Sequence, residues 1–214
     1  EPLFAMVLGL MKNLPAYRDG QRERSWEDRG PVSTMHGARV VVLGCGDIGS
    51  HFAQLCRGVG AHVAGVRRHV RSVPEGFESV HAMDELSELL PGADVVASFL
   101  PSTAATRGLA DASFFASMRT GAYFANGGRG DLVDAAALDG ALRSGHLGGA
   151  ALDVTSPEPL PRDSPLWDAP NCFITPHVSG GFHLSTVLDN VVDIAAENLR
   201  HLAAGEPIRN AVAR

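Results

Sequence analysis

Short apolar runs alternate with amphipathic segments along most of this chain. Residues 39–43, Arg-Val-Val-Val-Leu, form an almost continuous β-branched run, which is typical of a strand buried on both faces of a parallel sheet. Residues 48–59 follow with the periodicity of a helix. The same alternation predicts strands at 61–66, 93–99, 123–126, 149–153 and 172–175 and helices at 83–90, 113–118 and 134–143. Strands and helices that alternate at these lengths predict an α/β fold with a doubly wound parallel sheet.

A glycine pattern lies at the turn between the first strand and the first of these helices. Gly44 permits a tight turn, Gly46 removes a side chain that would block a pyrophosphate, and Gly49 lets the helix pack closely on the strand. Free N–H groups and the helix dipole would face the anion. Glycines can also serve only to make turns, but a strand before and a helix after this pattern favour a Rossmann-like dinucleotide-binding domain. The full pattern is Gly44-Cys45-Gly46-Asp47-Ile48-Gly49.

Two arginines, Arg67 and Arg68, follow the second predicted strand. A domain that selects NAD usually has Asp or Glu at this place to bind the ribose 2′-hydroxyl. Two guanidinium groups would instead pair with a 2′-phosphate through charge-assisted hydrogen bonds. The sequence therefore predicts that NADP(H) is preferred, with NAD(H) as the alternative cofactor. The competing interpretation is two solvated surface arginines.

Three further sequence blocks follow the glycine pattern, and together with it they resemble the D-isomer-specific 2-hydroxyacid dehydrogenases in order and spacing. The similarity is greatest to glyoxylate/hydroxypyruvate reductase-like members. The blocks are Val42 to Gly49; Leu100-Pro101-Ser102-Thr103-Ala104-Ala105-Thr106-Arg107-Gly108-Leu109; Asn126-Gly127-Gly128-Arg129-Gly130; and Ala151-Leu152-Asp153-Val154 through Glu158-Pro159-Leu160, followed by Ile174-Thr175-Pro176-His177.

The resemblance implies a catalytic set of Arg129, Glu158 and His177. Arg129, always charged and planar, would bind the carboxylate of a 2-ketoacid and polarise its carbonyl. His177 would protonate the carbonyl oxygen as hydride arrives, and would remove the hydroxyl proton in the oxidative direction. Glu158 would favour the imidazolium form and fix the ring. Taken singly, each of these residues could be an ordinary loop residue, and only their joint occurrence favours catalysis.

The resemblance also implies cofactor contacts. Asp153 would hold the nicotinamide carboxamide, Thr106 would lie near the phosphates, and Leu100 and Pro101 would lie beside the cofactor. The glycine pair before Arg129 would lie near the nicotinamide and is expected to make this loop unusually flexible. Thr155-Ser156 stand where relatives often have an aromatic residue and an acid, which puts the substrate fit in doubt. The complete set of predicted cofactor residues is Gly44, Gly46, Asp47, Ile48, Gly49, Arg67, Arg68, Leu100, Pro101, Thr106, Gly127, Gly128, Asp153 and Gly180.

The ends of the chain complete the predicted organisation. Residues 1–14 look helical and 15–31 form a polar connector, so residues 1–34 are predicted to serve in dimerisation or interdomain contact. The dinucleotide-binding domain is predicted at 35–182, and 183–214 would be a tail with a helix from about Leu184 to Ala204. Family members usually begin with a substrate domain to which nothing in this chain corresponds. We therefore expect the chain to be the later part of a longer protein, with its last helix returning to that domain.

Composition narrows the function classes. The 214 residues are 45% hydrophobic and 20% charged, which is ordinary for a soluble globular protein. A net charge of −6 gives no basic surface for nucleic acid. The apolar run at 3–11 is too short to span a bilayer and lacks the features of a signal peptide. Three cysteines without close pairs fit reduced thiols and a cytoplasmic location, and the histidines show no metal-ligand spacing.

The sequence supports three hypotheses about function. The first is an NADP(H)-dependent oxidoreductase of small 2-ketoacids or 2-hydroxyacids of the glyoxylate or hydroxypyruvate type. The second is a nucleotide-sensing interaction module related to the family's corepressors, and the third is an inactive truncated chain.

A homodimer is also expected, because the first helix carries more apolar surface than a lone surface helix needs. Its apolar residues are Leu3, Phe4, Met6, Val7, Leu8, Leu10 and Met11.

Overall fold

The computed structural model describes residues 1–70, 72–181, 185–209 and 211. The chain forms two compact units, Glu1–His177 and Val178–Arg214. The predicted domain boundary at 182/183 falls among residues that the structure does not describe. The other predicted boundary, at 34/35, lies inside the first unit.

The first unit is built on a seven-stranded sheet in which every strand pairs in parallel with its neighbours, in the order β3-β2-β1-β4-β5-β6-β7. The chain starts in the middle of the sheet at β1, builds one half outward and then returns to build the other, as in a doubly wound fold. This confirms the predicted fold class. The strands are β1 (Arg39–Leu43), β2 (His62–Val66), β3 (Ser79–His81), β4 (Val95–Ser98), β5 (Tyr123–Asn126), β6 (Gly149–Leu152) and β7 (Cys172–Ile174).

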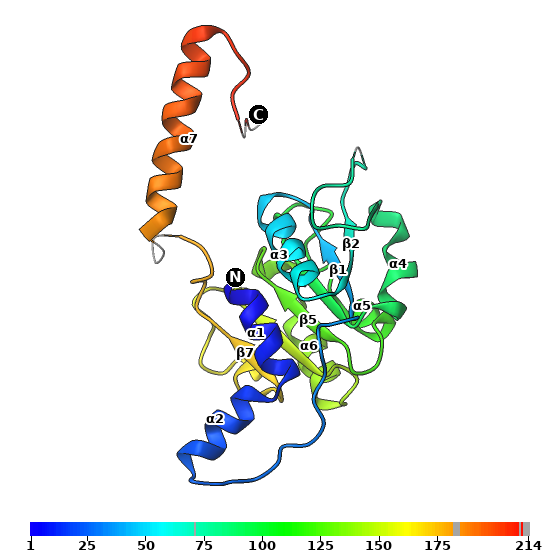
Figure 1. Ribbon diagram of the computed structural model, residues 1–214. Helices are drawn as coiled ribbons and strands as arrows, with labels where there is room; N and C mark the ends of the chain where they lie inside the picture. The colour runs from blue at the N-terminus through cyan, green and yellow to red at the C-terminus, as the bar shows by residue number, and fades with distance from the viewer. Residues whose placement is uncertain (71, 182–184, 210, 212–214) are drawn as a thin grey trace. The chain divides into compact units, whose positions relative to one another are not determined.

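Helices cover both faces of the sheet (Figure 1). Helices α1 and α3 pack on one face with side chains such as Val40, Val42 and Phe52, and α4, α5 and α6 lie on the other with Val41, Phe124 and Leu138. Because both faces are buried, the central strands β1, β4, β5 and β6 are largely apolar runs, as the sequence predicted. The helices are α1 (Pro2–Met11), α2 (Leu14–Arg22), α3 (Asp47–Gly58), α4 (Leu86–Leu89), α5 (Ala112–Ser117), α6 (Ala135–Arg143) and α7 (Ser185–Ala204), with 3-10 turns η1 (Met83–Glu85), η2 (Leu90–Gly92), η3 (Gly130–Leu132) and η4 (Pro165–Asp168).

Two elements were not predicted from the sequence. Strand β3 has only three residues, all half-buried at the edge of the sheet, so no apolar run marks it. Helix α2 lies in the segment that was predicted to be a polar connector, and this part of the prediction was wrong. Its first turn contains Pro15, which is favourable there, and it packs against α1. The helix predicted at 83–90 exists as η1, α4 and the start of η2.

Helix α1 belongs to the core of the first unit. Leu3, Met6, Val7, Leu10 and Met11 are buried, and the helix contacts β5 and β6. The apolar surface on which the expectation of a homodimer rested is therefore largely used within the chain itself. The exposed apolar side chains near this end lie instead on α2 and the segment after it.

The second unit contains α7, whose predicted start at Leu184 lies outside the described residues. Along this helix Leu188, Val191, Val192, Leu199 and Leu202 have exposed fractions between 53% and 68%. Their spacing places them along one side of an amphipathic helix. Among the described residues, no helix combines the length and apolar character needed to cross a bilayer.

Candidate active site and cofactor cavity

The predicted site residues follow the carboxyl ends of the strands. The glycine turn follows β1, Arg67 and Arg68 follow β2, and Leu100 and Pro101 follow β4. Arg129 follows β5, while Asp153 and Glu158 follow β6 and His177 follows β7. Because all strands are parallel, these residues meet along one edge of the sheet, where open α/β sheets bind ligands.

The glycine turn has the steric reasons that its pattern predicts. Gly44 has φ +98°, a conformation that L side chains rarely adopt, and a Cβ there would lie 3.1 Å from the backbone of Phe99. A Cβ on Gly49 would lie 1.9 Å from the Gly44 carbonyl oxygen, so only glycine lets α3 pack this closely. At Gly46 a Cβ would meet no atom within 4 Å, which leaves open space beside the turn.

The amino end of α3 faces this open space without a side-chain cap. The first N–H groups of a helix have no intrahelical acceptors, and here the side chain of the N-cap residue does not accept from them either. The helix dipole adds partial positive charge at the same place. Asp47 and Ile48 form the first turn, and both are exposed. The geometry fits a pyrophosphate, which needs close approach to the backbone and unpaired N–H donors.

A cavity of about 780 Å³ opens beside the turn. It brings together Gly44, Gly46, Arg67, Arg68, Leu100, Pro101 and Thr106 of the predicted cofactor residues. Within the described part of the chain, neither Arg67 nor Arg68 forms an ion pair with a carboxylate, and the Arg68 Nε–H donates to His69 Nε2 at 3.0 Å. Two guanidinium groups at a ligand-sized cavity fit a phosphorylated ribose.

Several residues of this cavity were missed by the sequence reasoning. Met83 and Asp84 come from η1, which follows the unpredicted strand β3, so no pattern placed them at the site. Asp84 is the acidic residue on the cavity wall, and a carboxylate can also accept a ribose hydroxyl. Cys45 lies on the same wall, and burial raises the pKa of its thiol despite the nearby charge of Arg67, so the thiol stays protonated.

The glycine pair before Arg129 is required by close packing rather than by flexibility. A Cβ on Gly128 would lie 2.6 Å from the Leu100 carbonyl oxygen, and one on Gly127 would lie 3.1 Å from the Phe99 ring. The Gly128 N–H also donates to Asn126 Oδ1 at 3.1 Å. The expectation of an unusually flexible loop was therefore wrong, because the pair lets this loop lie against the loop after β4.

Arg129 is exposed beyond β5, and hydrogen bonds hold both its backbone and its guanidinium group. The Asn126 side-chain amide donates to the Arg129 carbonyl oxygen at 2.9 Å, and the guanidinium Nη1 donates to the Gly128 carbonyl oxygen at 2.7 Å. Nη1 is one of three nitrogens in a group that offers five N–H donors, so donors remain for a ligand. Asn126 is itself fully buried. The arrangement ties one guanidinium nitrogen to the loop and leaves the remaining N–H donors for a ligand.

Glu158 and His177, which are 19 positions apart in the sequence, form a direct pair. His177 Nδ1 lies 2.9 Å from Glu158 Oε2, and both side chains are partly exposed. The Thr155 N–H donates to the other carboxylate oxygen, Oε1, at 3.0 Å. Because a carboxylate only accepts, Nδ1 carries the proton in this pair, and Nε2 is the atom that would exchange a proton with a ligand.

The surroundings of Glu158 keep it ionised. Burial would raise the pKa of Glu158, but the hydrogen bonds from His177 and from the Thr155 N–H outweigh burial, and the net effect lowers the pKa below its usual range. At neutral pH the carboxylate is therefore charged and accepts the hydrogen bond from the facing imidazole.

His177 has an unusual backbone that its neighbours hold in place. Its φ is +57°, in the left-handed region that few residues other than glycine adopt. Its N–H donates to the Asp153 carbonyl oxygen at 2.8 Å and to the Thr175 carbonyl oxygen at 3.0 Å. Such conformations cluster at functional sites, where the surrounding structure over-determines them.

A second cavity, of about 500 Å³, lies beside this pair. It is lined by Asp153, Glu158 and His177 together with mostly apolar residues that include Leu160 and Trp167. The structure thus places Asp153 with the catalytic candidates rather than on the first cavity. Gly180 belongs to the second compact unit, and its contact with the cofactor stays a prediction.

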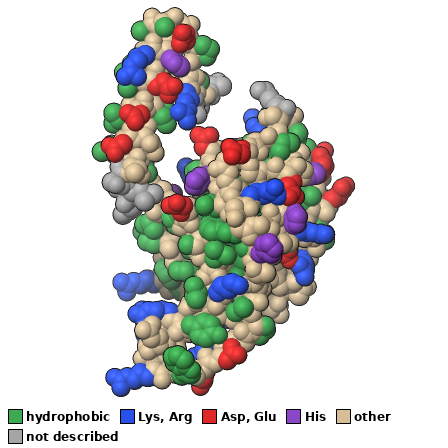
Figure 2. Space-filling view, viewed as in Figure 1, with side chains coloured by type: hydrophobic (Ala, Val, Ile, Leu, Met, Phe, Trp, Pro, Cys, Tyr) green, Lys and Arg blue, Asp and Glu red, His purple; other side chains and the backbone are tan. Residues whose placement is uncertain are grey.

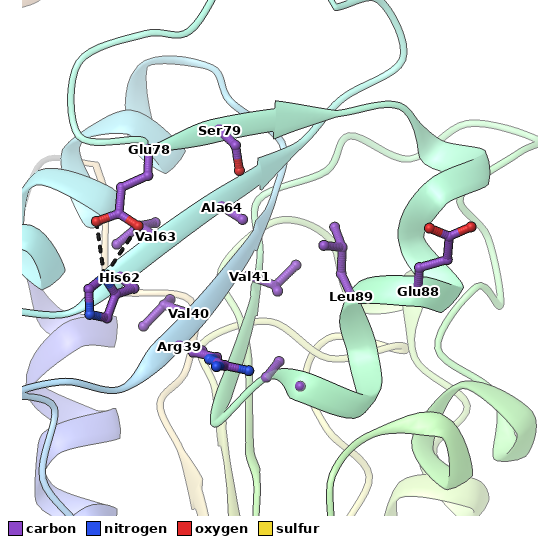
Figure 3. Close-up of a pocket in the computed structure, with 12 residues that line it drawn as sticks. Arg39, Val40, Val41, His62, Val63, Ala64, Glu78, Ser79, Glu88 and Leu89 are labelled. Atoms are coloured by element: carbon purple, nitrogen blue, oxygen red, sulfur yellow. Dashed lines mark hydrogen bonds and ion pairs between the residues drawn. The ribbon is translucent and has the colours of Figure 1, made fainter.

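A hollow of about 460 Å³ at the opposite edge of the sheet has a different character (Figure 3). It begins at Arg39 and His62, the first residues of β1 and β2, and Figure 3 shows Leu89 of α4 across from them. His62 Nδ1 lies 3.1 Å from Glu78 Oε1, and Glu78 also pairs with Arg57. These charged groups are engaged with one another and tie α3 to the edge of the sheet, so the hollow is not the candidate site.

Comparison with known proteins identifies the family. The profile of the family described as "D-isomer specific 2-hydroxyacid dehydrogenase, NAD binding domain" matches residues 4–179. The chain belongs to this family. The resemblance stated from the sequence blocks is thereby confirmed, and the matched residues are the family's NAD-binding domain.

Three 2-hydroxyacid dehydrogenase relatives illustrate the similarity. Glyoxylate/hydroxypyruvate reductase A from Photorhabdus laumondii is 33% identical over 202 residues, which cover 94% of this chain and 63% of that protein. D-3-phosphoglycerate dehydrogenase from Mycobacterium tuberculosis is 34% identical over 216 residues, covering 99% of this chain and 40% of that protein. A D-isomer specific 2-hydroxyacid dehydrogenase from Xanthobacter autotrophicus, crystallised with NADPH and MES, has a TM-score of 0.84 at 37% identity, covering 99% of this chain and 86% of that chain. This chain therefore spans 63% of the length of the reductase and 40% of the length of the phosphoglycerate dehydrogenase.

One further glycine of the candidate site yields a stability prediction. A Cβ on Gly130 would lie 1.9 Å from the Thr155 carbonyl oxygen, so Gly130→Ala must displace the loop that holds Glu158. We expect a loss of about 1–3 kcal/mol in the free energy of unfolding, measured by urea denaturation. Gly140→Ala is the matched control, because Gly140 lies exposed in α6 with no atom within 4 Å of its added Cβ, and this change should stabilise the protein slightly. Equal stabilities of the two variants would contradict the prediction.

Proposed function

We propose that this domain carries the cofactor site and the proton-transfer pair of an NADP(H)-dependent oxidoreductase for small 2-ketoacids or 2-hydroxyacids, of the glyoxylate or hydroxypyruvate type. The observation that carries the proposal is the contact of 2.9 Å between His177 Nδ1 and Glu158 Oε2 at the sheet edge that also carries the glycine turn. A cofactor cavity alone would be compatible with nucleotide sensing. The pair places a group that can exchange protons at the same sheet edge as the glycine turn, which nucleotide sensing alone does not need.

The residues have separate tasks in this proposal. When bound, the cofactor supplies or accepts the hydride. Arg129 binds the substrate carboxylate and polarises the carbonyl, because its head is accessible and always charged. His177 Nε2 donates the proton to the carbonyl oxygen in reduction and removes it from the hydroxyl in oxidation. Glu158 holds the ring through Nδ1 and stabilises its positive charge.

The cofactor tasks are divided along the same edge. The amino end of α3 and the glycine turn hold the pyrophosphate, with Asp47, Ile48 and Thr106 beside it. Arg67 and Arg68 bind the 2′-phosphate of NADP(H), and NAD(H) is the weaker alternative. Asp153 holds the nicotinamide carboxamide, with Leu100, Pro101, Gly127 and Gly128 beside the ring. The relative from Xanthobacter autotrophicus was crystallised with NADPH, which supports the phosphorylated cofactor.

The test of this function is NADPH oxidation in the presence of glyoxylate or hydroxypyruvate. We expect turnover by the protein with both ketoacids, and none with comparable aldehydes or ketones that lack a carboxylate. Tight NADPH binding without ketoacid turnover would contradict the oxidoreductase and favour the nucleotide-sensing module.

The predicted homodimer has a different surface from the one first inferred. Trp26 is fully exposed, and Leu14 and Val32 are more than half exposed. Trp26 and Tyr17 also help to line a cavity of about 660 Å³. Figure 2 shows hydrophobic side chains next to basic ones in the lowest part of the molecule, where Figure 1 places α2. An aromatic side chain exposed in this way is typical of an interface anchor. We place the dimer interface on α2 and the segment that follows it.

Light scattering at micromolar concentration tests this placement. We expect the mass of a dimer for the unmodified protein and a shift toward the monomer in Trp26→Asp, because a buried carboxylate would oppose association. Val59→Asp, which changes an exposed apolar residue at the end of α3, is the control and should leave the mass unchanged. A monomeric mass for the unmodified protein would exclude the dimer at that concentration.

A further inference from the structure

We infer that Thr175 is a positioning residue that orients the Asp153 carboxylate toward the nicotinamide. The inference rests on the proposed function, in which Asp153 holds the carboxamide of the cofactor. It assigns a task to the first residue of the Thr-Pro-His segment, of which only His177 has a task so far.

The contact between the two side chains is short and sheltered. Thr175 Oγ1 donates to Asp153 Oδ1 at 2.6 Å. Asp153 is only 3% exposed, and Thr175 is half-buried. The same hydroxyl also lies 3.6 Å from Met6 Sδ, but a thioether is a weak acceptor and the carboxylate is the strong one. Short O–H···O⁻ contacts of this kind belong to the strong class of hydrogen bonds.

The backbone fixes where the hydroxyl points. The Thr175 N–H donates to the Leu152 carbonyl oxygen at 2.9 Å, which keeps the end of β7 beside the residue before Asp153. Threonine is β-branched and therefore has few side-chain rotamers. A rigid donor on one strand end thus holds the carboxylate on the next one.

Asp153 also contacts the residue proposed to transfer the proton. Its carbonyl oxygen accepts the His177 N–H at 2.8 Å, and the Thr175 carbonyl oxygen accepts the same N–H at 3.0 Å. The side chain of Asp153 is thus tied to Thr175 and its main chain to His177. These contacts keep the Asp153 carboxylate, which would hold the nicotinamide, at a fixed position relative to His177, which would protonate the substrate. Hydride and proton transfer to the same carbonyl group require such a fixed arrangement.

A structural role and a positioning role make different predictions for ligand binding. If Thr175 only stabilises the fold, its loss should weaken every nucleotide equally or none. If it orients Asp153, its loss should weaken only ligands that carry a nicotinamide. The nucleotide 2′-phospho-ADP-ribose contains every part of NADPH except the nicotinamide, so it separates the two roles.

The experiment is calorimetric titration of the chain and two variants with NADPH and with 2′-phospho-ADP-ribose. Thr175→Val keeps the shape and removes the donor, whereas Thr175→Ser keeps the donor and removes the methyl group. We expect Thr175→Val to weaken NADPH binding by about tenfold and to leave 2′-phospho-ADP-ribose within about twofold of the unmodified chain. Thr175→Ser should restore most of the NADPH affinity.

Each other result has a defined meaning. Equal weakening of both ligands in Thr175→Val, or unchanged NADPH binding, would overturn the positioning role while leaving cofactor binding intact. If Thr175→Val unfolds, Thr175→Ala, which also removes the donor, is titrated with the same two ligands, and equal weakening of both would overturn the role. An unmodified chain that binds neither ligand would contradict the proposed function and the inference together.

Discussion

Replacing His177 by asparagine should lower the rate of ketoacid reduction by roughly a hundred- to ten-thousandfold, because the proton donor is lost while the site keeps its shape. Asparagine is the better replacement than alanine, since it tolerates the left-handed backbone that His177 adopts at φ +57°. The measurement is steady-state NADPH oxidation with glyoxylate and with hydroxypyruvate. NADPH affinity should change little, because the imidazole faces Glu158 rather than the cavity beside the glycine turn.

Glu158→Gln is the companion variant, because it preserves shape and removes the charge. Glutamine can still accept the Thr155 N–H, so the loop should be retained. Without the negative charge the imidazole loses its charged hydrogen-bond partner at Nδ1, and the reductive rate should fall by at least about tenfold. An unchanged rate in Glu158→Gln would contradict the role of Glu158 in the pair.

The lowered pKa of Glu158 gives the sign of a pH effect on stability. A carboxyl whose pKa is lower in the folded than in the unfolded protein contributes stability above its ordinary pKa, and that contribution disappears as pH falls through the lowered value. The pair with His177 is therefore intact at neutral pH and is lost only in acid. Because both side chains are partly exposed, the contribution to stability is small.

The sequence predicted those parts of the fold in which local pattern and tertiary environment agree. Strand β1 is apolar because both faces of the sheet are covered, and the turn after it needs glycine at Gly44 and Gly49 for steric reasons. Strand β3 and helix α2 escaped prediction because neither carries such a pattern. The first is a three-residue edge strand, and the second is a polar helix stabilised by its contact with α1.

The candidate site was predictable where residue type and position after a strand coincide. Arg129, Glu158 and His177 follow this rule, and the structure brings Glu158 and His177 into contact. Asp84 lies in a helical segment that was predicted, but the unpredicted strand β3 before it brings it to the cavity, so no local pattern marked it as a site residue. The close approach of Gly128 to the Leu100 carbonyl depends on two loops that are far apart in sequence, so flexibility was inferred where packing decides.

The second large effect concerns the choice of cofactor. Replacing Arg67 and Arg68 together by glutamine should weaken NADPH binding by roughly a hundredfold, because charge-assisted hydrogen bonds to the 2′-phosphate are lost. NADH binding should change by less than about threefold, since NADH has no phosphate at that position. The measurement is fluorescence titration of the chain with both reduced cofactors. Arg18→Gln, at an exposed position on α2, removes one positive charge outside the cavity and should leave both affinities unchanged.

Ionic strength distinguishes a phosphate contact from an indirect effect of the two arginines on the shape of the cavity. Added salt screens exposed charge pairs, so NADPH binding to the unmodified chain should weaken more steeply with salt than NADH binding does. In the double variant this difference should disappear.

Asp84 on the same wall would select the other cofactor, because a carboxylate that accepts a ribose hydroxyl would favour NADH. Tighter binding of NADH than of NADPH by the unmodified chain would therefore contradict the role of Arg67 and Arg68 and assign the selection of cofactor to Asp84.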